Sequence, residues 1–99
     1  MLMMMRATVD TVAGNKAMQE GTMGKLIEQT HALLAPEAAY FSLDGGRRTC
    51  YFFCDLKDPL VKPQVAEAWF ATAHASVEFL PILNGDQVRQ AMERLAPKR

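Results

Sequence analysis

Strand-like and helix-like segments alternate along this chain in an order that few small folds can accommodate. Four segments carry the side-chain alternation of strands: residues 4–9, 38–43, 47–56 and 76–83. Helix-like patterns fill residues 13–20, 22–35 and 58–74, and a last one starts near residue 84. A strand–helix–strand unit on each side of a central hairpin predicts a ferredoxin-like α+β fold, a four-stranded antiparallel sheet with helices on one face. We expect residues 1–99 to form a single domain.

Glycines and a threonine mark the boundaries in the first half of the chain. Asp44-Gly45-Gly46 predicts a tight hairpin turn, because glycine accepts the positive φ that such turns need. Gly21 is expected to end the short first helical segment. Thr22 is then expected to cap the longer helix that follows.

Prolines and acidic residues mark the boundaries in the second half. Asp58-Pro59 predicts a helix start, with Asp58 as the cap and Pro59 at the first helical position, and Pro63 indicates an irregular first turn before the regular helix. Pro81 cannot donate to a ladder of hydrogen bonds, so the last strand is expected at a sheet edge or a bulge. Asn84 or Asp86 is expected to cap the final helix.

Both faces of the predicted sheet are largely apolar, since alternate side chains along a strand point to opposite faces. One face carries Met3, Met5, Ala7, Val9, Cys50, Phe52, Cys54, Val77 and Phe79. The other carries Leu2, Met4, Tyr51, Phe53, Leu80 and Ile82, with Arg6, Thr8 and Glu78 among them. An antiparallel sheet with one wet face normally alternates apolar and polar residues, and the helices cover only one face. The sequence therefore predicts an obligate homodimer whose sheets face each other.

Composition argues against several classes of function. Eleven Lys and Arg balance eleven Asp and Glu, so no charge excess favours nucleic acid or an anionic membrane surface. The chain lacks both a run of ~18 apolar residues and a signal-peptide pattern, so we expect a cytoplasmic protein. Cys50 and Cys54 would lie ~13 Å apart in a strand, too far for a disulfide. Neither His31 nor His74 has a metal-ligand spacing, so no metal or other cofactor is expected.

Arg6 is the one charged residue in the first predicted strand. A guanidinium within a sheet face needs a partner, and Glu78 in the neighbouring last strand is the expected one. In one interpretation the two form a structural ion pair, which could also cross a dimer interface. In the other, Arg6 recognises an anion in a cavity, together with Thr8 and Tyr51 as ligand-binding side chains, and Glu78 is a candidate catalytic acid or base.

A second set of candidates lies on the helix that follows residue 58. Glu67, Phe70 and His74 share a face away from the predicted core stripe. Phe70 is either a surface or interface aromatic with solvated neighbours, or a ligand-binding side chain. His74 is a candidate catalytic residue, because a histidine can act as a base near neutral pH.

The chain resembles the dimeric α/β-barrel superfamily over nearly its whole length. The resemblance rests on the order of elements, the two-faced sheet and the strand Val-Glu-Phe-Leu-Pro-Ile-Leu at residues 77–83. Segments 36–41, 44–48 and 58–59 are similar to a group of short bacterial proteins of unknown function. The superfamily resemblance implies that two ferredoxin-like subunits close their sheets into a barrel, with a cavity inside the barrel or between sheet and helices.

The resemblance leaves two kinds of function open, because members of the superfamily include small monooxygenases, isomerases, haem-degrading enzymes and proteins with no known activity. The leading expectation is a protein that binds a small apolar molecule. If it is an enzyme, we expect a cofactor-independent monooxygenase or isomerase. The alternative is a non-catalytic homodimerising module with no ligand site, in which the apolar face is only an interface.

Overall fold

The structure is a computed structural model that describes residues 1–97. It shows an α+β fold in which the elements follow the predicted order. The elements are β1 (Leu2–Thr8), α1 (Thr11–Glu20), α2 (Thr22–Leu34), β2 (Ala38–Asp44), β3 (Arg47–Asp55), α3 (Val61–Ala73), β4 (Ser76–Pro81) and α4 (Gly85–Leu95).

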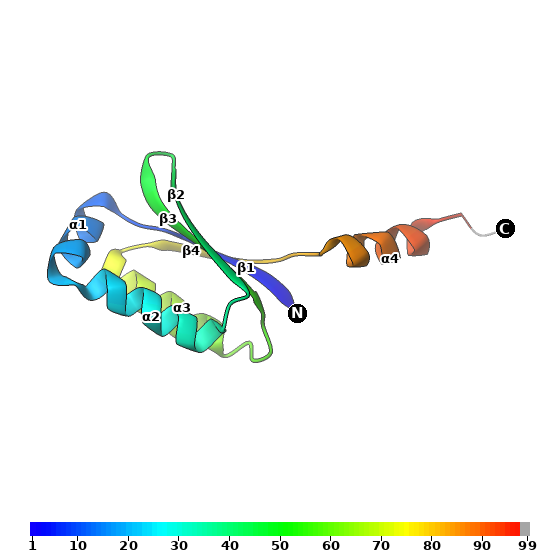
Figure 1. The fold of residues 1–99 in the computed structure, drawn as a ribbon, viewed down its shortest axis with the longest axis horizontal. Helices are drawn as coiled ribbons and strands as arrows, with labels where there is room; N and C mark the ends of the chain where they lie inside the picture. Colours follow the sequence, from blue (N-terminus) through cyan, green and yellow to red (C-terminus); the bar gives the residue numbers. More distant parts are fainter. Residues whose placement is uncertain (98–99) are drawn as a thin grey trace.

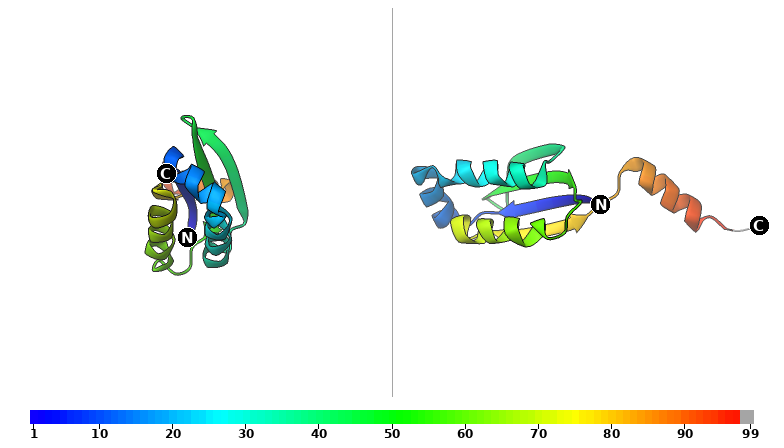
Figure 2. Two further views of the ribbon diagram at one scale, coloured as in Figure 1. Left: turned by 90° about the vertical axis from the view of Figure 1, so that its left-hand side faces the viewer. Right: turned by 90° about the horizontal axis from the view of Figure 1, so that it is seen from below.

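The four strands form one antiparallel sheet in the order β2-β3-β1-β4. This order fits a ferredoxin-like fold, and it places β4, which ends at Pro81, at an edge as predicted. Helices α2 and α3 run side by side beneath one face of the sheet, and α1 lies at one end of them (Figures 1 and 2). Within residues 1–97 no helix covers the other face, which we call the open face (Figure 1).

The hydrophobic core lies between the sheet and the helices α2 and α3. The sheet contributes the face predicted for it, including Met3, Met5, Ala7, Cys50, Phe52 and Cys54. From the helices, Met23 and Leu26 of α2 and Val65 and Trp69 of α3 are buried against these residues. The indole Nε1 of Trp69 donates to the Thr30 hydroxyl at 2.8 Å, so a buried hydrogen bond also joins the two helices.

The hairpin between β2 and β3 is the predicted two-residue turn. Gly45 and Gly46 have φ of 61° and 78°, values that glycine adopts without strain. The predicted cap at Thr22 is wrong: Gly21, with φ of 76°, ends α1 and also occupies the cap position of α2. Thr22 already belongs to the helix, and its hydroxyl donates back to the Ala17 carbonyl at 3.3 Å.

The start of α3 also differs from the prediction. The Asp58 carboxylate accepts from the Leu60 N–H at 3.0 Å, so Asp58 and Pro59 form a separate turn. The regular helix begins at Val61, and Leu60 is its cap residue. Pro63 lies within the first helical turn, where its missing N–H would have no helical partner in any case.

Helix α4 stands apart from the rest of the fold. The chain leaves β4 as an extended segment, and α4 begins beyond the end of the sheet, clear of α2 and α3 (Figures 1 and 2). Asn84 caps it as predicted, since its side chain accepts from the Gln87 N–H while the Gln87 side chain accepts from the Asn84 N–H. This projection gives the molecule principal extents of 63 × 29 × 18 Å.

Candidate functional site

A row of polar side chains crosses the open face from one edge of the sheet to the other. The strand register places Arg6 between Tyr51 of β3 and Glu78 of β4. Tyr40 of β2 lies opposite Tyr51 and completes the row. Because residues that pair across strands point to the same face, these four side chains lie together on the open face.

Arg6 and Glu78 form the predicted ion pair. The Arg6 Nη2 atom lies 2.7 Å from Glu78 Oε1 and 2.9 Å from Oε2, and Nε lies 3.2 Å from Oε1. The hydrogen bonds and the charge of Glu78 raise the pKa of Arg6. The two side chains are 32% and 47% exposed, so solvent screens the pair in a single chain. Covering the open face would remove this screening and strengthen the attraction between them.

Tyr51 is held by the end of the neighbouring strand. Its hydroxyl donates to Asp44 Oδ2 at 3.1 Å. Burial raises the pKa of Tyr51, and the hydrogen bond and charge of Asp44 raise it further. The phenol therefore stays protonated at neutral pH and acts as a hydrogen-bond donor. Asp44 and Tyr40 were not among the predicted site residues, although a two-residue turn after Asp44 already fixes Tyr40 opposite Tyr51.

The open face changes from apolar to polar along the strands. Next to the polar row, towards the N-terminal end of β1, lies an apolar row formed by Ala38, Phe53, Met4 and Leu80. Leu2 and Ile82 lie beyond it in the same direction. The other side of the polar row carries a row of hydroxyl side chains formed by Ser42, Thr49, Thr8 and Ser76. Thr49 is only 1% exposed and its hydroxyl donates to the Arg47 carbonyl at 3.0 Å. A molecule on this face would therefore meet an apolar row, the charged pair with a phenol, and then the hydroxyl groups of Ser42, Thr8 and Ser76.

The structure separates the two sets of predicted site residues. Thr8 lies on the open face next to the row that holds Arg6, Tyr51 and Glu78. Phe70 and His74 belong to the helix layer on the covered side of the sheet (Figure 1). The ring of Phe70 is 42% exposed.

His74 ends α3 in a left-handed conformation with φ of 46°. Its side chain lines a hollow of about 390 Å³ beside α1, together with Asp10, Lys16 and Glu20. The Asp10 carboxylate in this hollow already accepts from the Ala13 N–H at 2.9 Å, as the cap of α1. His74 thus lies in the hollow beside α1, whereas the candidate acid or base Glu78 pairs with Arg6 on the open face.

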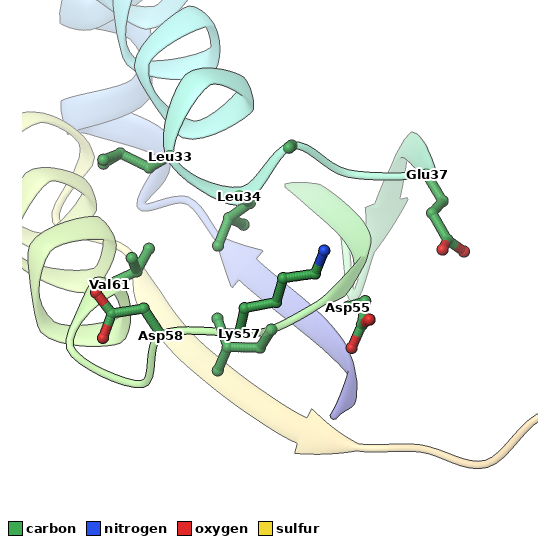
Figure 3. A pocket seen from close by; sticks show the side chains of 9 residues that line it. Leu33, Leu34, Glu37, Asp55, Lys57, Asp58 and Val61 are labelled. Carbon is green, nitrogen blue, oxygen red and sulfur yellow. The ribbon is translucent and has the colours of Figure 1, made fainter.

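Two further hollows lie on the helix side of the molecule. One of about 380 Å³ opens where α2 ends and α3 begins, with Leu33, Leu34 and Val61 on one side and charged residues such as Lys57 near them (Figure 3). A smaller apolar one of about 200 Å³ lies between the helices and the β2–β3 hairpin, lined by Val9, Met18, Met23, Ile27, Phe41 and Cys50. Among residues 1–97, no group of three His, Cys, Asp or Glu side chains could hold a metal ion.

The two cysteines are free and buried, as the strand spacing predicted. Burial raises the pKa of the Cys50 thiol to about 11, and it also raises the pKa of Cys54. Only the thiolate is a good nucleophile, so neither cysteine is activated for covalent chemistry.

The comparisons with known proteins add no relative: no protein-family model matches the chain, and no curated protein matches its sequence. In the part of the chain that the structure describes, no helix is both long and apolar enough to cross a membrane. The open face, with its apolar row beside the pair of Arg6 and Glu78, is the candidate functional site.

Proposed function

We propose that this protein is a homodimeric small-molecule-binding protein of the dimeric α/β-barrel type, in which the open faces of two sheets enclose the ligand. The open face carries this proposal, because an apolar row lies directly beside the row that holds Arg6 and Glu78. Full burial of one large apolar side chain is worth roughly 1.5–3 kcal/mol. Covering Met4, Phe53 and Leu80 with a second sheet would therefore favour association.

The ligand that suits this face is a small apolar molecule with an anionic or hydrogen-bonding group. Arg6 would anchor the anionic group, and the Tyr51 phenol and the Thr8 hydroxyl would supply further hydrogen bonds. If the site is catalytic, Glu78 is its acid or base, and the reaction class is a cofactor-independent oxygenation or isomerisation. In this arrangement Phe70 and His74 lie behind the sheet and take no part.

A second candidate function is a non-catalytic dimerising module. It is favoured by the hydrogen bonds between Arg6 and Glu78: Arg6 Nη2 donates to both carboxylate oxygens of Glu78, as expected of a structural ion pair. The hollows beside α1 and at the start of α3 are also lined mainly by helix and loop residues rather than by the open face. In this alternative the two open faces pack together at the density of a protein interior and leave no cavity.

A binding experiment with an apolar anion distinguishes the ligand-binding protein from the dimerising module. The probe is 1-anilinonaphthalene-8-sulfonate, whose fluorescence rises in an apolar site, titrated against protein of native circular dichroism. We expect saturable binding, weakened at least tenfold by Arg6→Met. The matched control is Lys25→Met, which removes an exposed cation of α2, on the covered side of the sheet, and should leave the affinity unchanged. Equal affinity in the wild type and in Arg6→Met would contradict the ligand site and favour the dimerising module.

A further inference from the structure

Helix α4 carries an apolar surface that its own chain leaves exposed. Val88, Met92 and Leu95 are 44%, 66% and 82% exposed. At 100° per residue these three side chains and Ala91 fall within an arc of about 100° on the helix. The charged residues of α4, Asp86, Arg89, Glu93 and Arg94, lie outside this arc. We call the four residues in the arc the α4 stripe.

The length of α4 indicates that the stripe is a contact surface. The helix has 11 residues, and isolated helices shorter than about 12–15 residues are marginal in water. The capping box at Asn84 and Gln87 supports its first turn only. Most of the stability of a short amphipathic helix comes from packing its apolar face, so the stripe needs a partner.

The charges of α4 favour a protein partner over a lipid surface. Helices that lie on anionic membranes carry many Lys and Arg residues on their polar face. Here Asp86 and Glu93 balance Arg89 and Arg94 within the helix. The polar face therefore provides no net attraction to an anionic bilayer.

The position of α4 identifies that protein as a second copy of the same chain. The helix follows Ile82, whose N–H donates to the Leu2 carbonyl at the apolar end of the open face. Helix α4 therefore begins next to the apolar end of the surface that the proposed dimer covers. A standard interface takes roughly 20–30 residues from each partner. The open face offers only five rows of at most four side chains, and several of these are polar. The α4 stripe supplies the apolar contacts that the open face lacks.

We infer that α4 is an arm that packs its stripe against a second copy of the chain, so that open face and arm form one continuous interface. The inference rests on the proposed dimer and deepens it, because it makes α4 a necessary part of the association. The extended segment before α4 holds the helix away from its own sheet and helices (Figure 1). This is the placement that an arm exchanged between subunits requires.

The test compares two substitutions on opposite sides of α4 by sedimentation equilibrium. Met92→Asp places a charge at the centre of the stripe, and Gln90→Asp places the same charge on the exposed polar side. We expect the dimer dissociation constant to rise at least tenfold for Met92→Asp and to change less than threefold for Gln90→Asp. Neither residue belongs to the core between sheet and helices, so the subunit should keep its native circular dichroism.

The possible outcomes separate this inference from the proposed function. A wild-type protein that is monomeric throughout would contradict the dimer and the arm together. A wild-type dimer that Met92→Asp leaves equally tight would overturn the arm alone. Hydrogen exchange provides an independent measurement, since the amides of residues 88–95 should be protected only at concentrations where the dimer forms. Protection that persists in the monomer would show that α4 packs on its own chain, and this result would also overturn the inference.

Discussion

The hydrogen bond between Trp69 and Thr30 is the main polar contact inside the core. Trp69 is fully buried and Thr30 is 2% exposed, so water cannot replace either partner. The Thr30 hydroxyl also donates to the Leu26 carbonyl at 2.8 Å, which fixes its orientation. One hydroxyl thus serves as acceptor for the indole of α3 and as donor within α2.

Replacing Thr30 by valine should destabilise the protein by about 1–3 kcal/mol, because the indole N–H of Trp69 would stay buried without an acceptor. Thr30→Ser keeps the hydroxyl and serves as the control, with a smaller loss due to the missing methyl group. Urea unfolding followed by tryptophan fluorescence measures both free energies. A loss for Thr30→Val no larger than that for Thr30→Ser would show that the hydrogen bond contributes little.

Burial of Cys50 predicts a loss of stability at high pH. The pKa of this thiol is raised from 9.0 to about 11, so the unfolded chain ionises first as the pH increases. Between about pH 9 and pH 11 this group should lower the free energy of unfolding by about 1.4 kcal/mol per pH unit. Below about pH 9 it should have no effect. The measurement is the free energy of unfolding against pH for wild type and Cys50→Ala, and parallel curves would contradict the prediction.

Helix α1 closely approaches the sheet at Gly14. A Cβ atom at Gly14 would lie 2.7 Å from Val9 Cγ1 and 2.8 Å from Arg48 Nη1. Val9 is buried and β-branched, and the Arg48 Nη2 atom is held by Asn15 Oδ1 at 3.0 Å, so neither neighbour moves easily. Glycine at position 14 is what lets α1 lie against β1 and β3.

Alanine substitutions at two helical glycines should therefore have opposite effects. Gly14→Ala should cost about 1–3 kcal/mol through overpacking. Gly24→Ala, in the first turn of α2, meets nothing within 4 Å and should stabilise the protein by about 0.4–1 kcal/mol. Thermal unfolding of the two variants gives the comparison. Equal melting temperatures for both would show that α1 can shift without cost.

The sequence predicted well which residues lie on each face of a strand and which strands are neighbours. Alternation in β1 and β3 separated Met5 and Phe52 from Arg6 and Tyr51, and the structure confirms this division. The ion pair between Arg6 and Glu78 followed from the topology, because the first and last strands of this fold are neighbours. Strand faces and strand neighbours are thus readable without coordinates.

The sequence did not predict which candidate site residues lie together, because this depends on how the helices pack on the sheet. His74 and Glu78 are only four residues apart, yet one ends a helix on the covered side and the other lies on the open face. The helix caps at Thr22 and Asp58 were wrong because Gly21 and Leu60 took those positions. A cap is worth about 1 kcal/mol, so the surrounding structure can move a helix boundary by one or two residues from the position that the cap residue favours.

Within residues 1–97, one face of the sheet and one face of α4 remain uncovered. The core occupies the space between the sheet and the helices α2 and α3, and the open face and the α4 stripe lie outside it. The proposed dimer covers both surfaces with the same partner. It also encloses the pair of Arg6 and Glu78, whose attraction strengthens when water is excluded.

The mass of the native protein in solution tests the proposed dimer most directly. Sedimentation equilibrium from about 0.1 to 100 μM, on protein purified without added ligand, gives this mass without dependence on shape. We predict a mass of twice the 11.0 kDa of the single chain at micromolar concentration and above. A mass of 11.0 kDa over the whole range would contradict it, because the open face would then be stable in water on its own.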